Sequence, residues 1–254
     1  MTSPAVATKA QLDMLAPARL FRRGWQVYRY TREVSERAEK FANAESPQLL
    51  HERAQLLQEM CANAMKLHGM EIVVHGSLPK PPYIMVCNHL GYMDPIILSA
   101  IQPCAPIAKR ELGDWPILGP ALLSMGVMLV HRGNLHQSAT ILRRAHRALD
   151  AGLAVVNFPE GTTTVGDHVL PFKRGIFGLA RMTNVPVVPT RIEFSDPKDS
   201  WTGNDGFLGH YIRFGAMPTH GVRFRICDPV DPNDYESAQD MAEQMRTFIA
   251  NLAT

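Results

Sequence analysis

The residues best suited to chemistry are His89 and Asp94, which stand at the two ends of a short loop that contains a glycine. An apolar run from Tyr83 to Val86 predicts a buried strand that ends just before His89. Asp94 is followed by Pro95, a pair typical of a helix start with Asp at the cap. The intervening residues can fold the carboxylate back onto the imidazole. A carboxylate on one ring nitrogen leaves the other nitrogen available as a base.

Two other interpretations of the same stretch stay open. In the first, Asp94 merely caps a helix and His89 is an incidental loop residue, because Asp is a common N-cap residue. Cys87 is a rival nucleophile, since it lies two residues before His89 and could share its side of a strand. That role requires a lowered thiol pKa, whereas a buried structural thiol is the more common case.

Two further loops follow predicted strands, where the binding residues of open α/β sheets usually lie. The first, residues 109–116, begins with Lys109, and the second, residues 130–133, contains Arg132. Each loop alone is a weak signal, because an arginine after a strand is most often a solvated charge.

A third loop, residues 158–175, is the richest in polar groups. It combines glycines, the three hydroxyls of residues 162–164, and the cations Lys173 and Arg174 beside a predicted helix start. Backbone amides at a helix start and cationic side chains suit a phosphate or another anion.

These loops require a layered architecture to bring them together. Short apolar segments alternate with segments of helical periodicity along most of the chain, which predicts helices packed on a sheet. We therefore expect an α/β fold with a mixed, largely parallel central sheet flanked by helices. Strands are expected at 71–75, 83–86, 106–108, 127–130, 153–158, 185–192 and 222–226, and helices at 12–41, 48–68, 95–100, 115–124, 136–149, 174–183 and 237–252, with a short helix at 210–214 in an otherwise irregular segment.

The N-terminal segment predicts an amphipathic helix of unusual composition. Arginines stand beside Trp and Tyr, as in helices that lie in a membrane interface. A helix that packs its apolar face on the rest of the chain is the alternative, and one helix can do both. The apolar half of the wheel carries Leu20, Phe21, Gly24, Trp25, Val27 and Tyr28, and the other half carries Arg22, Arg23, Gln26, Arg29 and Glu33.

Composition narrows the class of protein. The 254 residues are 46% hydrophobic, which is enough for a large core. A formal net charge of +2 gives no basic field for nucleic acid. The four cysteines are scattered without metal-ligand spacing, which fits a reducing compartment. We see neither a signal peptide nor an apolar run long enough to span a membrane.

Taken together, the loops form four ordered blocks that resemble those of the glycerolipid acyltransferase family, the lysophosphatidic acid acyltransferases and their relatives. No single block is specific, but the four in order are. They are His89 with Asp94, Lys109-x-Glu111-Leu112 with the later Arg132, Phe158-Pro159-Glu160-Gly161-Thr162, and Val185-Pro186-Val187-x-Pro189.

The resemblance implies O-acyl transfer from a fatty acyl thioester, acyl-CoA or acyl carrier protein, to a lysolipid hydroxyl. His89 would be the general base and Asp94 would orient it, with backbone amides at Glu160–Gly161 as the expected oxyanion donors. The reaction calls for no metal and no cofactor besides the acyl donor. The residues expected to bind substrate are Lys109, Arg132, Glu160, Gly161, Thr162, Lys173 and Arg174.

The same resemblance implies an acceptor of 1-acyl-glycerol-3-phosphate, giving phosphatidic acid. Many members that use such acceptors carry Arg where this chain has Thr163, and Thr cannot replace that charge. Lyso-ornithine lipid is the alternative acceptor. Two rival functions are an acyl hydrolase that uses water on the same His–Asp pair, and a lipid-binding protein without catalysis.

We divide the chain accordingly. Residues 1–69 are expected to be an N-terminal helical segment at the membrane interface, and residues 70–254 an acyltransferase catalytic domain. The expected partners are membrane lipids and the acyl donor, with no nucleic acid, and the expected location is peripheral, on the cytoplasmic face of the cell membrane. A hydrophobic tunnel for the acyl chain is expected to be lined partly by residues 115–130.

Overall fold

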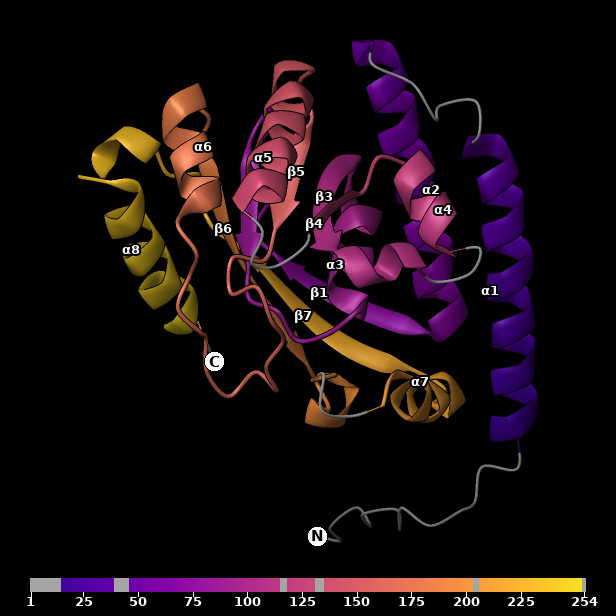
Figure 1. Cartoon of the computed structure of the whole chain (residues 1–254). Coiled ribbons are helices and arrows are strands. Elements are labelled where there is room, and N and C mark those ends of the chain that lie inside the picture. Colours follow the sequence, from indigo (N-terminus) through magenta and orange to yellow (C-terminus); the bar gives the residue numbers. More distant parts are fainter. Residues whose placement is uncertain (1–14, 39–45, 115–117, 131–134, 203–205, 253–254) are drawn as a thin grey trace, which may run out of the picture.

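A seven-stranded sheet forms the centre of the computed structural model, which describes residues 15–38, 46–114, 118–130, 135–202 and 206–252 (Figure 1). The strand order across the sheet is β1-β7-β6-β2-β5-β3-β4. The strands are β1 (Met70–His75), β2 (Ile84–Cys87), β3 (Cys104–Lys109), β4 (Met128–Val130), β5 (Ala154–Asn157), β6 (Val187–Phe194) and β7 (His220–Ile226).

Strand directions make the sheet mixed but largely parallel, as the sequence predicted. Strands β6, β2, β5, β3 and β4 pair in parallel, whereas β7 runs antiparallel to β6 and parallel to β1. Because parallel strands present their carboxyl ends at one edge, the loops that follow β2, β3 and β5 are brought to the same edge of the sheet.

Helices cover both faces of the sheet (Figure 1). Residues of α5, α6 and α8 pack with β2 and β5 in one buried cluster. Residues of α3 and α7 join a second cluster on the other face, while α1, α2 and α4 share a third. The helices are α1 (Ala16–Ala38), α2 (Pro47–His68), α3 (Met93–Ile101), α4 (Leu118–Ser124), α5 (Leu135–Asp150), α6 (Gly175–Thr183), α7 (Phe207–Ala216) and α8 (Ala238–Ala250), with short 3-10 turns η2 (Arg110–Asp114), η3 (Pro197–Asp199) and η4 (Pro232–Asp234).

Strand β2 shows why its sequence is a continuous apolar run. Ile84 and Val86 face the cluster with α5, while Met85 and Cys87 face the opposite cluster. All four side chains are fully buried, because a central parallel strand has helices on both faces. The strand therefore holds the loop that follows it on a rigid base.

Helix α1 differs from the expected wheel at Arg23. The wheel placed Arg23 on the polar half, but its side chain is buried. Its guanidinium donates hydrogen bonds to the main-chain oxygens of Leu67 (2.7 Å), Gly215 (2.9 Å) and Pro218 (3.0 Å). Carbonyls at the ends of α2 and α7 thus replace water around the charge, and Arg23 ties α1 to the body of the protein.

The apolar half of α1 is divided: Leu20 and Val27 are half-buried, whereas its aromatic side chains are exposed. Phe21 is 79% exposed, Trp25 55% and Tyr28 42%, and the last two rings stack with centroids 5.8 Å apart. No helix within the described residues combines the length and the apolar composition that crossing a bilayer requires.

Candidate active site

His89 and Asp94 are joined by a direct hydrogen bond. Nδ1 of His89 lies 2.8 Å from Oδ2 of Asp94, and the Asp94 carboxylate is fully buried. A carboxylate can only accept, so the ring donates from Nδ1 and keeps Nε2 unprotonated in its neutral form. Among the described residues Nε2 has no hydrogen-bond partner, and the His89 side chain is 15% exposed. The geometry is that of a base held in one tautomer.

Asp94 does not cap α3 in the way the sequence suggested. The helix begins at Met93 after Tyr92, and the Asp94 side chain turns back toward the preceding loop. Its Oδ2 also accepts hydrogen bonds from the main-chain N–H groups of Leu90 and Gly91, the latter at 2.8 Å. One oxygen therefore fixes both the imidazole and the backbone between the two residues.

Phe158 supports the other side of the imidazole. The rings of His89 and Phe158 stack with centroids 4.4 Å apart and planes inclined by 25°. Phe158 follows β5, the neighbour of β2 in the sheet, so the two aromatic rings meet because their strands are paired. Asp94 and Phe158 together restrict the tilt and rotation of the ring.

Glu160 links the loop that follows β2 to the loop that follows β5. Oε1 accepts from the main-chain N–H of His89 and Oε2 from that of Leu170, both at 2.8 Å. Burial raises the pKa of the Glu160 carboxyl, while these two hydrogen bonds oppose the rise. Glu160 thus acts on the shape of the site, as an acceptor that joins residues far apart in the chain.

Gly161 adopts a conformation that favours glycine, with φ at 72°. A Cβ built at this position would lie 2.6 Å from Nζ of Lys173, so the lysine crosses close over the loop. The Gly161 N–H donates to the Phe158 oxygen at 3.1 Å and closes a turn. In this structure the Gly161 N–H is thus used within the loop, and the role of the Glu160–Gly161 amides as oxyanion donors stays a prediction.

Four of the remaining predicted residues lie around the same edge. Thr162, Lys173 and Arg174 are exposed, and the last two immediately precede α6. Lys109 is the exposed final residue of β3, one strand beyond β5. Arg132 lies outside the described residues.

Cys87 does not suit the rival role of nucleophile. Its side chain is fully buried on the face of the sheet that α3 covers. Burial raises the pKa of the thiol, the opposite of what an attacking thiolate needs.

Two positioning contacts were absent from the sequence predictions. Asn88 is buried and its side-chain amide exchanges two hydrogen bonds with the main chain of Ile192, at 3.0 and 2.8 Å, which fastens the end of β2 to β6. Tyr92, inside the loop, donates to or accepts from Nδ1 of His210 at 3.0 Å. The side chain of an Asn directly after a strand is a weak signal, and nothing near Tyr92 in sequence points to α7.

Within the described residues no cluster of three or more His, Cys, Asp or Glu side chains could hold a metal ion. The residues gathered at this edge are instead a His–carboxylate pair, a bridging carboxylate and surface cations.

Comparison with known proteins agrees with this geometry. The acyltransferase family model matches residues 65–193. A lyso-ornithine lipid O-acyltransferase of Brucella abortus is 32% identical over 213 residues, which cover 74% of this chain and 77% of that protein. A human 1-acyl-sn-glycerol-3-phosphate acyltransferase alpha is 34% identical over 144 residues, 54% of this chain and 51% of that protein.

The fold also has a solved counterpart. The crystal structure of the 1-acyl-sn-glycerophosphate (LPA) acyltransferase PlsC from Thermotoga maritima superposes with a TM-score of 0.68. The match covers 94% of this chain and 93% of that one at 22% identity. The family model spans both His89 and Glu160, and the Brucella relative extends over most of the sequence. The chain belongs to the acyltransferase family.

Proposed function

We propose that this acyltransferase moves a fatty acyl group from an acyl thioester to the free hydroxyl of a lysolipid, with His89 and Asp94 as its catalytic pair. The observation that carries the proposal is the His89 imidazole, held by Asp94 at Nδ1 with Nε2 left for substrate. A base in this state can accept a proton from an alcohol as the alcohol attacks a carbonyl.

The reaction then runs in two steps. As the acceptor hydroxyl oxygen attacks the thioester carbonyl carbon, its proton passes to Nε2 of His89, and Asp94 stabilises the resulting imidazolium. The tetrahedral intermediate collapses with cleavage of the C–S bond. The departing thiolate takes the proton back from His89, which restores the neutral ring. General base catalysis of this kind contributes roughly 10²–10⁴-fold.

The loops around the pair supply the expected binding groups. Glu160 and Gly161 shape the third loop, and the exposed cations Lys109, Lys173 and Arg174 surround the edge where an anionic acceptor or donor would approach. Cationic side chains of this kind pair with phosphate or carboxylate groups.

For the acceptor we favour lyso-ornithine lipid. Thr163 stands where an arginine would provide a bidentate phosphate contact, and a zwitterionic head group needs no such contact. The lyso-ornithine lipid relatives from Brucella abortus and Pseudomonas aeruginosa match 74% and 70% of this chain, against 54% for the human glycerol-phosphate enzyme. 1-Acyl-glycerol-3-phosphate is the second candidate, favoured by the 34% identity of that shorter match.

The substrate resides in a membrane, and α1 offers a means to reach it. Phe21, Trp25 and Tyr28 project from the side of α1 that faces away from the body, among exposed arginines. The neighbouring helix α7 adds the exposed side chains of Leu208 and Ile212. Aromatic side chains beside arginines favour insertion at the interface of an anionic bilayer. We therefore propose peripheral attachment through this surface.

An acceptor screen tests the proposal. The full chain is incubated with radiolabelled acyl-CoA or acyl carrier protein and, in turn, lyso-ornithine lipid, lysophosphatidic acid, other lysophospholipids and buffer alone. Label is expected in diacylated ornithine lipid, and not with His89→Ala. Label in phosphatidic acid would establish the second acceptor. Free fatty acid in every reaction would establish a hydrolase and overturn the proposed transfer.

A further inference from the structure

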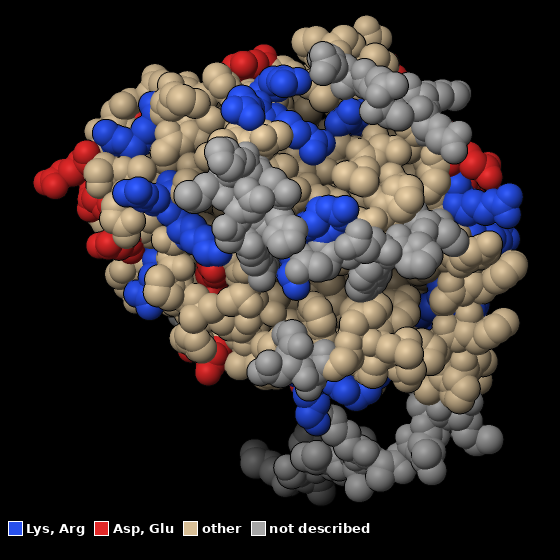
Figure 2. Space-filling model, in the orientation of Figure 1, with Lys and Arg blue, Asp and Glu red and all other residues tan. Residues whose placement is uncertain are grey.

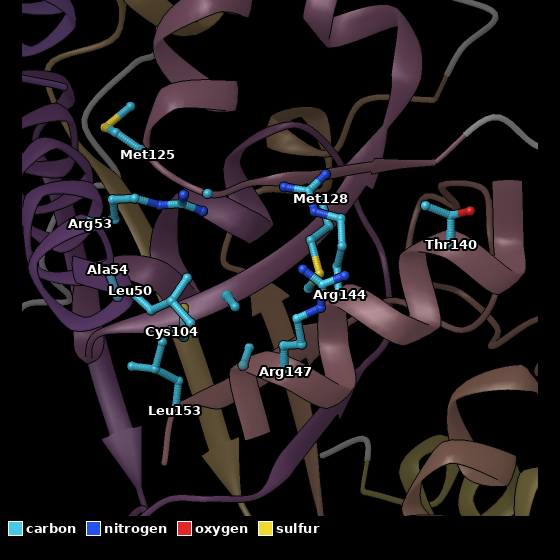
Figure 3. A pocket seen from close by; sticks show the side chains of 13 residues that line it. Leu50, Arg53, Ala54, Cys104, Met125, Met128, Thr140, Arg144, Arg147 and Leu153 are labelled. Atoms are coloured by element: carbon cyan, nitrogen blue, oxygen red, sulfur yellow. The ribbon is translucent and has the colours of Figure 1, made fainter. Parts of the chain in front are cut away.

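A cavity of about 310 Å³ lies between α2 and α5 (Figure 3), and His89 is not among the residues that line it. Leu153 precedes β5, Cys104 opens β3, and Gly126 comes just before β4, so the cavity opens beside the amino ends of these strands. The proposed catalytic residues follow the carboxyl ends. Five residues of extended chain separate Leu153 from Phe158, a rise of about 16 Å. The cavity is therefore separate from the catalytic edge.

Three guanidinium groups converge on this cavity from two helices. Arg53 extends from α2, and Arg144 and Arg147 extend from α5 toward it (Figure 3). Figure 2 shows Lys and Arg side chains gathered around a hollow near the top of the view, where α2 begins and α5 ends in Figure 1. The side chain of Arg144 is half-buried.

The charges are close enough to disturb one another. Burial first, and then the charge of Arg144, lower the pKa of Arg53. Burial and the charge of Arg147 lower the pKa of Arg144 in the same way. No Asp or Glu is found among the described residues that line the cavity, and within the described part of the chain Arg144 has no hydrogen-bond acceptor. An anion bound beside Arg144 would relieve the repulsion that its guanidinium experiences.

The backbone makes room for this arrangement. Gly126 has φ at +86°, and a Cβ there would lie 2.6 Å from Nη2 of Arg53. Glycine thus allows the guanidinium to pass close to the start of β4. The hydroxyl-bearing Thr140 lies on the α5 side, and Leu50, Met125 and Met128 supply apolar walls. The cavity combines a cationic end with an apolar surface, and its volume is at the small end of ligand sites.

We propose that this cavity is a binding site for a phosphate-bearing small molecule, held by Arg53, Arg144 and Arg147. Guanidinium groups bind phosphate oxygens in pairs of hydrogen bonds, and the two negative charges of a phosphate monoester would offset most of the positive charge of the three arginines. The apolar wall accommodates the group that carries the phosphate. The site neither takes part in acyl transfer nor depends on the lysolipid acceptor.

The test is calorimetric titration of the full chain in phosphate-free buffer. Three probes share the phosphate and differ in the group attached to it, namely inorganic phosphate, 3′,5′-adenosine diphosphate and hexyl phosphate. We expect saturable binding of at least one. Arg53→Gln and Arg144→Gln are each expected to weaken that binding about tenfold or more, since each removes a charge-assisted contact. The probe that binds tightest separates a free phosphate, a nucleotide and a lipid phosphate as the source.

Lys66→Gln is the matched control, because it removes one positive charge from an exposed position of the same helix as Arg53. Its dissociation constant should stay within about twofold of the wild-type value. The temperature of unfolding is measured with and without probe, so that a variant is compared with its own unliganded form. The proposal would be overturned if no probe bound up to millimolar concentration, or if both arginine variants bound the probe as tightly as the wild type does. Neither result bears on acyl transfer, which the titration does not measure.

Discussion

The main-chain N–H of His89 donates a hydrogen bond to Oε1 of Glu160, which lies 71 residues later in the chain. The other oxygen of the same carboxylate holds the main chain at Leu170. The position of His89 is therefore set by Asp94 through the ring and by Glu160 through the backbone. Loss of the Glu160 contact would therefore free the main chain at His89, whereas loss of the Asp94 contact would free the imidazole ring.

Glu160→Gln should weaken the fold. A glutamine offers one acceptor oxygen in place of two, so one of the two buried N–H groups loses its partner, at a cost of about 1–3 kcal/mol. Burial raises the pKa of Glu160 above its ordinary 4.5. The neutral carboxyl then adds to the free energy of unfolding below about pH 4.5, and this contribution is lost as the pH rises through the higher pKa of the folded state.

Urea unfolding of both proteins between pH 4 and 8 checks this sign. The stability advantage of the wild type over Glu160→Gln should be largest at acid pH and shrink as pH rises. An advantage that grows with pH would mean that the folded protein favours the ionised carboxylate, contrary to the effect of burial.

His89→Ala should lower kcat by about 10²–10⁴-fold, because it removes the general base. Asp94→Asn should also lower kcat strongly, since an amide can donate to Nδ1 and so stabilise the wrong tautomer. Steady-state rates with acyl thioester and the accepted lysolipid measure both losses. Circular dichroism should show native helix content in His89→Ala. Full turnover in a folded His89→Ala protein would exclude His89 as the base.

The sequence predicted the sheet and the contact between His89 and Asp94 well because both depend on local signals. The apolar run before His89 is continuous since β2 is buried on both faces, and this is readable without a structure. The direction of the Asp94 side chain is not local in that sense. The Asp-Pro pair suggests a cap, but the Asp94 carboxylate instead accepts hydrogen bonds from three loop donors, the ring of His89 and the main-chain N–H groups of Leu90 and Gly91.

Long-range contacts account for the other differences. Arg23 falls on the polar half of its wheel, yet carbonyls at the ends of α2 and α7 satisfy its charge and draw it inward. Helix α7 spans Phe207–Ala216 and is longer than the helix expected at 210–214. Its residue Phe214 is buried against the sheet, whereas Leu208 is exposed. Periodicity within a helix cannot reveal a partner more than 100 residues away.

Cys87→Ala should retain most of the activity, within about fivefold of wild type, because a fully buried thiol with a raised pKa is no nucleophile. A loss of stability is expected instead, since the change leaves a small cavity beside α3. Rates and thermal unfolding separate the two effects. A covalent acyl-Cys87 adduct, seen by mass spectrometry of the wild type during turnover, would contradict this expectation.

Gly161→Ala should reduce activity more than a glycine-to-alanine change that strains the backbone equally at another position. A non-glycine residue in the left-handed region costs about 1–2 kcal/mol. At Gly161 the new Cβ would also meet Lys173, at 2.6 Å from Nζ, and push the lysine off the loop. Gly152→Ala is the control, because its φ is similar at +80° but nothing lies within 4 Å of the added carbon.

The two variants should lose similar unfolding free energy, measured by urea denaturation. Only Gly161→Ala should raise KM for the acceptor or lower kcat, by about tenfold. Equal kinetic losses in both would show that the position of Lys173 over the third loop has no bearing on substrate.

The exposed aromatic side of α1 should govern binding to membranes. Deleting the whole segment would also remove Arg23 and its contacts with α7, so point variants are the sharper test. Trp25→Ser should lower partition onto anionic vesicles about tenfold or more, because burying a large apolar side chain contributes about 1.5–3 kcal/mol. Met182→Ser is the control, since Met182 is 69% exposed but lies on α6. Vesicle sedimentation measures both, and equal retention by the two variants would assign membrane binding to another surface.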